Sequence, residues 1–159
     1  MNNSSIFSLA KIEYNKQLID VLKYPIYDKF KSIYDESKNH DSIINGFRLK
    51  LNDIPKWNTD ILENEIENII NLSNCDWIDD LITAVFVSHI KILASINNKE
   101  KQINLVIPKS INFIHKCFIN IARELWKNPY LFDESITGWE YQRNIKMIES
   151  IIIESIELV

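Results

Sequence analysis

The stretch SNCDWIDDLITAVFVSHIKILASI, residues 73–96, decides the fold class of this chain. Its apolar residues recur every three or four positions over several turns, which is the period of one face of an α-helix. The residues of that face are Ile78, Leu81, Ile82, Val85, Phe86, Ile92, Leu93 and Ile96. This stretch is the strongest helix prediction in the sequence, and it favours an all-α protein.

The acidic residues that open this stretch have a structural explanation. Asp76, Asp79 and Asp80 fall at its beginning, where Ser73, Asn74 or Asp76 is the expected N-cap. Acids in the first turn offset the helix dipole and meet unpaired backbone N–H groups, each worth about 0.3–1 kcal/mol. We therefore interpret the cluster as a helix start that needs no metal.

Composition supports the same fold class. A chain of 159 residues fits one domain, and 46% of its residues are apolar, enough for a sizeable core. The 2 glycines and 4 prolines are too few for the tight turns of an all-β fold. We predict a single α-helical domain over residues 1–159, a compact bundle of about six helices in which residues 1–10 are flexible.

The positions of the other helices follow from periodicity and from helix breakers. Pro25 is expected to divide the N-terminal region, because proline lacks a backbone N–H. Residues 97–102 read as a loop, and 103–108 as an extended connector in preference to a strand. The last helix has no C-cap signal, so it either frays or continues in a longer parent protein. The expected helices cover residues 7–23, 26–37, 41–51, 59–70, 78–96, 109–127 and 139–159.

Charge is unevenly distributed along the chain. Residues 53–80 carry eight acids and one base, a balance of −7, whereas residues 81–130 carry seven bases and two acids, a balance of +5. The two segments either pack together and neutralise each other or form a polar surface for a partner. The net charge of −4 makes nucleic acid an unlikely ligand.

Cysteine usage and hydropathy indicate a reduced intracellular compartment. The two cysteines, Cys75 and Cys117, are too few for a disulfide framework, so both thiols are expected to be free. The first residues lack the basic and apolar regions of a signal peptide. No apolar run approaches the roughly 20 residues of a membrane span.

His89 is the most informative single residue. It lies in the middle of the apolar stripe of residues 78–96, so we predict that it is buried, with its ring hydrogen-bonded inside the core. A functional site and a pH-sensitive contact remain as alternatives.

Catalytic and metal patterns are weak. Cys75, His89, His115 and Cys117 are zinc-ligand types, but their spacing matches no compact zinc motif. A Cys–His nucleophile pair has no local signature, and two glycines exclude a glycine-rich phosphate loop. We expect no enzyme activity, no cofactor and no metal.

A protein-docking surface is predicted between residues 109 and 139. Lys116, Arg123 and Lys127 share one face of the expected helix, which suits a solvated face, an acidic protein partner or, less well, nucleic acid. Aromatic residues follow closely and could extend this face into an apolar patch. The alternative is that the aromatic segment folds back and closes the core. The candidate docking residues are Phe113, Lys116, Arg123, Trp126, Lys127, Tyr130, Phe132 and Trp139.

The chain also resembles a family of helical proteins from nucleocytoplasmic large DNA viruses, the giant viruses. The similarity covers roughly residues 20–159 and rests on IPKWN (54–58), SNCDWIDDLITAVFVSHIKILASI (73–96), IPKSINFIHKCFINIARELWKNPYLF (107–132) and YQRNIKMIESIIIESI (141–156). It implies a late, virion-associated or minor capsid protein made in the cytoplasmic virus factory of the host. The resemblance assigns no catalytic residues to this chain.

Together these features predict a non-enzymatic structural or interaction protein of a large DNA virus. Its expected partners are capsid or other virion proteins, and it could form oligomers. The alternative is a small helical regulatory or host-interaction module that acts during infection.

Overall fold

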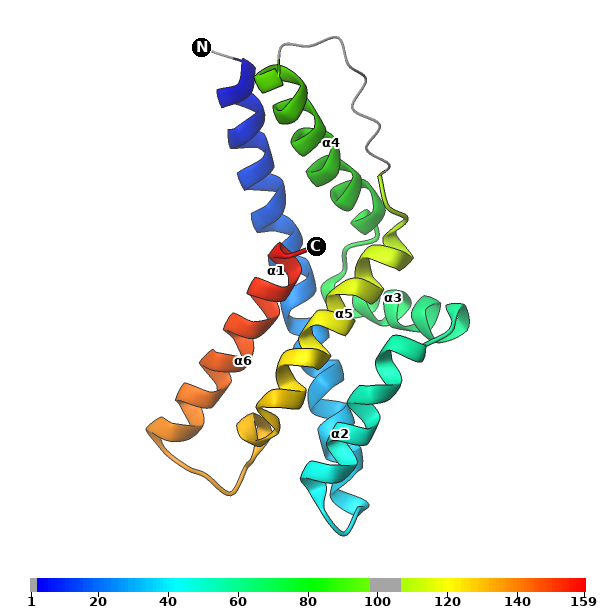
Figure 1. Cartoon of the computed structure of the whole chain (residues 1–159), viewed down its shortest axis with the longest axis vertical. Coiled ribbons are helices and arrows are strands. Elements are labelled where there is room, and N and C mark those ends of the chain that lie inside the picture. Colours follow the sequence, from blue (N-terminus) through cyan, green and yellow to red (C-terminus); the bar gives the residue numbers. More distant parts are fainter. Residues whose placement is uncertain (1–2, 98–106) are drawn as a thin grey trace.

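The computed structural model describes residues 3–97 and 107–159, which form six α-helices and three short 3₁₀ turns around a shared core (Figure 1). Neither described segment contains a β-strand, so the all-α prediction is confirmed. The predicted loop and connector lie outside these residues, apart from Asn97, Ile107 and Pro108. No helix in the described ranges is both long and apolar enough to cross a membrane. In chain order the elements are α1 (Asn3–Glu36), η1 (Ser37–Asn39), α2 (Ile43–Asp53), η2 (Ile54–Lys56), α3 (Thr59–Ser73), α4 (Ile78–Asn97), α5 (Ser110–Lys127), η3 (Pro129–Phe132) and α6 (Trp139–Glu157).

The first helix corrects the prediction that Pro25 divides it, because α1 runs through this proline. A proline inside a helix removes one backbone hydrogen bond and costs about 3 kcal/mol. Leu22 and Ile26 on either side are fully buried, and burying each such side chain contributes about 1.5–3 kcal/mol. The free energy gained by burying these side chains therefore exceeds the cost of the proline in the helix. The helix also begins earlier than predicted, since residues 3–10 form its first turns.

α1 is the axis on which the other helices pack. α4 runs beside its N-terminal half, and α2, α3 and α6 contact it further along (Figure 1). α5 packs on α2, α3 and α6, and its Phe118 ring lies 5.6 Å from the Phe30 ring of α1. Contacts between distant segments thus bury apolar side chains of α5 and of the second half of α1.

Asparagine sets both ends of α3. The side chain of Asn58 accepts a hydrogen bond from the backbone N–H of Ile61 at 2.9 Å and so caps the N-terminus of the helix. Asn74 ends the helix in the left-handed conformation, with φ of 56°. Ser73, one of the expected starts of the next helix, closes α3 instead, because its Oγ donates to the Ile69 carbonyl at 2.6 Å.

Gly46 lies inside α2, where the side chain of His40, in the bend before the helix, leaves no room for a Cβ. A Cβ at this position would lie 2.7 Å from ring atoms of His40 and 2.9 Å from its Cβ. Glycine in a helix interior costs about 1 kcal/mol relative to alanine. The close approach to His40 explains why α2 keeps this glycine.

The aromatic segment between α5 and α6 folds back onto the core. Phe132 is 5% exposed, and its ring centroid lies 5.8 Å from Tyr27, 5.7 Å from Tyr34 and 5.8 Å from Phe47. Leu131 beside it is also buried. The alternative in which this segment closes the core is therefore confirmed.

Candidate functional site

A groove between α5 and the α2–η2 segment brings together three of the predicted docking residues, Arg123, Trp126 and Lys127. Its volume is about 290 Å³. Of its wall residues five are apolar or aromatic, two are basic and none is acidic. A mostly apolar wall with a few polar groups is typical of binding sites. The wall residues are Leu51, Asn52, Pro55, Ile119, Ala122, Arg123, Trp126 and Lys127.

Arg48 of α2 holds Trp126 in place at this groove. Its guanidinium carbon lies 4.7 Å from the centroid of the indole, and its Nε donates a hydrogen bond to the Trp126 carbonyl at 3.1 Å. A cation–π contact at an exposed site contributes about 0.5–1 kcal/mol. The indole is 42% exposed, so it presents apolar surface in an orientation that is set before a partner binds.

The basic stripe predicted on α5 is exposed in the structure. Arg123 forms no ion pair with any described residue, whereas Lys127 lies 3.2 Å from the Glu124 carboxylate of the same helix. Lys116 is two helical turns before Arg123 and shares its side of α5, outside the groove. Within the described part of the chain, the groove therefore has one cation without an ion pair, one partly neutralised cation and a third cation nearby.

The acidic and basic segments do not neutralise each other through ion pairs. α3 contacts α5, but across residues 3–97 and 107–159 no ion pair joins residues 53–80 to residues 81–130. Glu65 of the acidic segment binds Lys29 of α1 instead, at 2.8 Å. The segments therefore lie in contact through α3 and α5, but the described residues form no ion pair between them.

Two predicted docking residues are corrected by their burial. Phe113 is 3% exposed, and its ring packs edge-on against Phe86 of α4 at 5.7 Å. Phe132 lies in the aromatic cluster of the core, so neither side chain belongs to an open surface. Tyr130 and Trp139 are exposed, as predicted, but they lie outside the groove.

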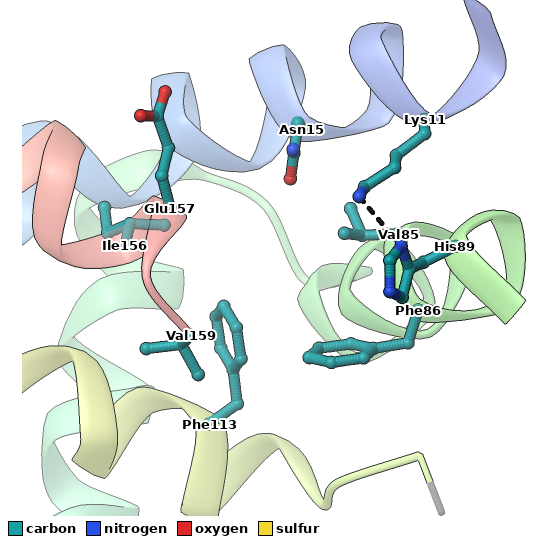
Figure 2. Close-up of a pocket in the computed structure, with 9 residues that line it drawn as sticks. All are labelled: Lys11, Asn15, Val85, Phe86, His89, Phe113, Ile156, Glu157 and Val159. Carbon is teal, nitrogen blue, oxygen red and sulfur yellow. Dashed lines mark hydrogen bonds between the residues drawn. The ribbon is translucent and has the colours of Figure 1, made fainter. Parts of the chain in front are cut away.

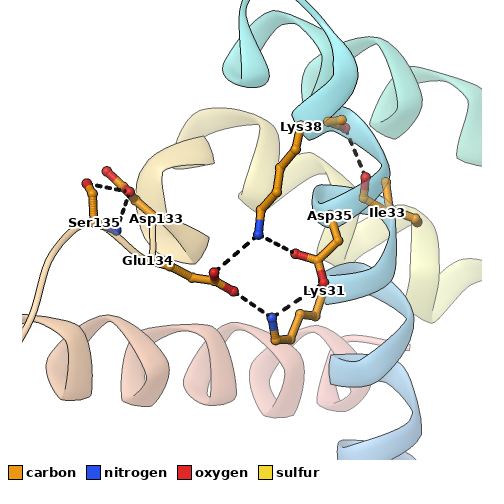
Figure 3. A network of polar contacts seen from close by, with 8 residues as sticks. Lys31, Ile33, Asp35, Lys38, Asp133, Glu134 and Ser135 are labelled. Carbon is orange, nitrogen blue, oxygen red and sulfur yellow. Dashed lines mark hydrogen bonds and ion pairs between the residues drawn. The ribbon is translucent and has the colours of Figure 1, made fainter.

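A network of charged side chains fastens the segment after η3 to α1. Glu134 receives hydrogen bonds from Lys31 at 2.8 Å and from Lys38 at 3.2 Å, and both lysines also contact Asp35 (Figure 3). These hydrogen bonds lower the pKa of Glu134 and raise the pKa values of the two lysines. The network is an electrostatic clasp between distant parts of the chain.

His89 is half-buried, which corrects the prediction that it lies inside the core. It lines a pocket between α1, α4, α5 and α6, where Lys11 Nζ donates a hydrogen bond to its Nδ1 at 2.9 Å (Figure 2). Desolvation, and to a smaller degree the charge of Lys11, lowers the pKa of the imidazole. Because an ammonium can only donate, Nδ1 accepts this hydrogen bond and the ring carries its proton on Nε2. Lys11 was missed by sequence reasoning because only the packing of α1 on α4 brings it to His89.

The four potential zinc ligands have other roles in the structure. His115 bonds to the Ile54 carbonyl through Nε2 at 2.8 Å. Cys75 and Cys117 are buried free thiols, as predicted, and desolvation raises the pKa of Cys117 to about 12. In the described ranges no group of three or more His, Cys, Asp or Glu side chains is placed to hold a metal ion.

Comparison with known proteins identifies one relationship. No curated protein and no solved structure matches the chain. A family of unknown function, DUF5764, matches residues 4–133, which span α1 to η3 and include the whole groove. This match covers most of the sequence, and the chain therefore belongs to the DUF5764 family.

Proposed function

We propose that this chain is a non-enzymatic interaction module. Its groove between α2 and α5 docks a segment of a partner protein in which acidic side chains flank an apolar anchor. The observation that carries the proposal is the groove itself. It combines an exposed indole at Trp126, held in place by Arg48, with the guanidinium of Arg123, which forms no ion pair with the described residues.

The chemistry of the groove favours a peptide over a nucleic acid. Nucleic-acid affinity comes mainly from several cations that neutralise successive phosphates. This groove has two cations among mostly apolar walls, in a chain of net charge −4. A carboxylate can form paired hydrogen bonds with Arg123, while an apolar side chain of the same segment packs beside Trp126. Interface hot spots are enriched in tryptophan and arginine for these reasons.

We further propose that the module is a structural component of a large DNA virus, as a minor capsid or virion-internal protein. Its partners would then be capsid or other virion proteins, and it would be found in the virion and in the host's cytoplasmic virus factory. The support is the resemblance of residues 54–58, 73–96, 107–132 and 141–156 to proteins of those viruses. A regulatory or host-interaction module would use the same groove on a different partner.

Site-specific crosslinking tests the docking site. A photoreactive amino acid at Asn52, in the groove, is compared with one at Lys146, on the exposed side of α6, in infected cells. We expect one defined adduct from position 52 alone, attached to an acidic segment that mass spectrometry identifies. Arg123→Glu should reduce the adduct at least about tenfold, because charge reversal costs about 1.4 kcal/mol or more, whereas Arg123→Lys should retain most of it.

An adduct that is equally strong from both positions, or that is unchanged by Arg123→Glu, would overturn the docking site. The viral setting has a separate test, which is quantitative mass spectrometry of purified virions. A fixed copy number relative to the major capsid protein supports a structural role. Absence from virions, with presence in infected cells, would contradict that role and favour the regulatory module.

A further inference from the structure

A second cavity, which shares no wall residue with the groove, has the features of a small-molecule site. Its volume is about 220 Å³, and four helices and the segment after α6 contribute to its walls (Figure 2). These residues come from distant parts of the chain, so only the assembled fold creates the cavity. The wall residues are Lys11, Asn15, Val85, Phe86, His89, Phe113, Ile156, Glu157 and Val159.

One end of this cavity offers hydrogen-bond donors and a positive charge. The Lys11 ammonium has three N–H donors and uses one of them on His89 Nδ1. The Nε2–H of His89 has no partner among the described residues. Lys11 forms no ion pair within residues 3–97 and 107–159. Glu157 also lines the cavity, but its carboxylate is turned away from the Lys11–His89 pair (Figure 2).

The other end is apolar and aromatic. The rings of Phe86 and Phe113 meet edge to face at 5.7 Å, and Val85, Ile156 and Val159 are the other apolar residues of the wall. An engineered apolar cavity of about 150 Å³ binds benzene. A cavity of about 220 Å³ therefore has room for one ring and a short polar group.

We propose that this cavity binds a small organic carboxylate, with the anion on Lys11 and His89 and an apolar body against Phe86 and Phe113. A carboxylate accepts hydrogen bonds and donates none, which matches the unused donors of the lysine and the imidazole. Its charge offsets Lys11, whose nearest polar partner is a neutral ring. The Lys11 ammonium would repel an organic cation, and a neutral ligand would not compensate the lysine's charge.

Phenylacetate is a suitable probe because it has one aromatic ring and one carboxylate. Binding to the full chain is followed by NMR, with phenylacetamide as the uncharged isostere. We expect saturable shifts at His89, Phe86 and Phe113, with phenylacetate binding at least about tenfold more tightly than the amide, since loss of one charge-assisted contact costs about 1.4 kcal/mol or more.

Variants at Lys11 separate this site from general anion binding. Lys11→Met should reduce the affinity for phenylacetate at least about tenfold, whereas Lys11→Arg should retain much of it. Lys16→Met, on the same helix but outside the cavity, should not change the affinity. Circular dichroism checks that each variant is folded. If Lys11→Met does not fold, the comparison of phenylacetate with phenylacetamide in the unmodified chain still tests the proposal. The proposal is overturned by absence of saturable shifts at millimolar phenylacetate, by equal affinity for the amide, or by unchanged binding in folded Lys11→Met.

Discussion

At the scale of single residues, the most consequential contact is the ion pair between α1 and α3. Glu65 is 5% exposed, and its carboxylate lies 2.8 Å from Lys29 Nζ. The same ammonium lies 5.7 Å from the centroid of the Trp57 ring. A buried charge is tolerated only when it is paired and hydrogen-bonded. The ion pair with Lys29 therefore offsets the cost of burying the Glu65 carboxylate.

Removal of Lys29 tests this dependence. Lys29→Met retains much of the side-chain volume but leaves the Glu65 carboxylate buried and unpaired, so we expect a loss of about 1–3 kcal/mol in the free energy of unfolding. Urea denaturation measures this loss. Lys146→Met, at an exposed position of α6, is the control and should change stability by less than about 0.5 kcal/mol. Equal stability of the two variants would show that Glu65 does not need its partner.

At the scale of elements, Glu134 connects the segment before α6 to the end of α1. Its pKa is lowered in the folded state, chiefly by the hydrogen bond from Lys31 and then by that from Lys38. A lowered folded pKa means that the unfolded chain binds the proton more readily. The clasp consequently stabilises the fold above the unfolded pKa of about 4.3 and is lost as pH falls through the folded pKa.

The pH dependence of Glu134→Gln checks the clasp. We expect this variant to be less stable than the unmodified chain at pH 7. The difference should shrink as pH falls below the unfolded pKa of about 4.3, because the unfolded carboxylate then binds a proton, and should vanish once the pH is below the lowered folded pKa of Glu134. Thermal unfolding across this pH range measures the effect. Lys146→Gln, at an exposed position of α6, removes no carboxylate and should not show the same convergence. A constant difference at all pH values would exclude an electrostatic clasp.

At the scale of the whole molecule, α6 completes the core although the family match ends at residue 133. It contacts α1, α5 and η3, and its residues Ile148, Ile152 and Ile156 are buried. Burial of three such side chains contributes roughly 5–9 kcal/mol, which is comparable with the total stability of a domain, about 5–15 kcal/mol. The matched region and α6 therefore form one cooperative unit.

Truncation after residue 133 tests this unity. We expect the shortened chain to lose cooperative urea unfolding and to expose apolar surface, as measured by binding of a hydrophobic dye. Leu158→Ala is the control and should preserve the transition, because Leu158 is 79% exposed. A shortened chain with a full cooperative transition would show that α6 is dispensable.

The candidate site was only partly predictable from the sequence. The periodicity of residues 109–127 placed Lys116, Arg123 and Lys127 on one face, because helical spacing alone determines which side chains share a side. Nothing local indicated that Arg48 holds Trp126 or that Lys11 reaches His89. Both contacts join residues 78 positions apart, so they depend on how the helices pack.

The sequence by itself determined the all-α class, the boundaries near residues 59 and 110, and the free thiols. Apolar periodicity, an N-cap and residue type are local properties, and local interactions are sufficient to set them. Only the tertiary structure decided that α1 continues through Pro25, that Phe113 and Phe132 are buried, and which helices enclose the two cavities. Those outcomes depend on burial by segments distant in the chain, whose contribution of several kcal/mol exceeds the local preferences that the sequence shows.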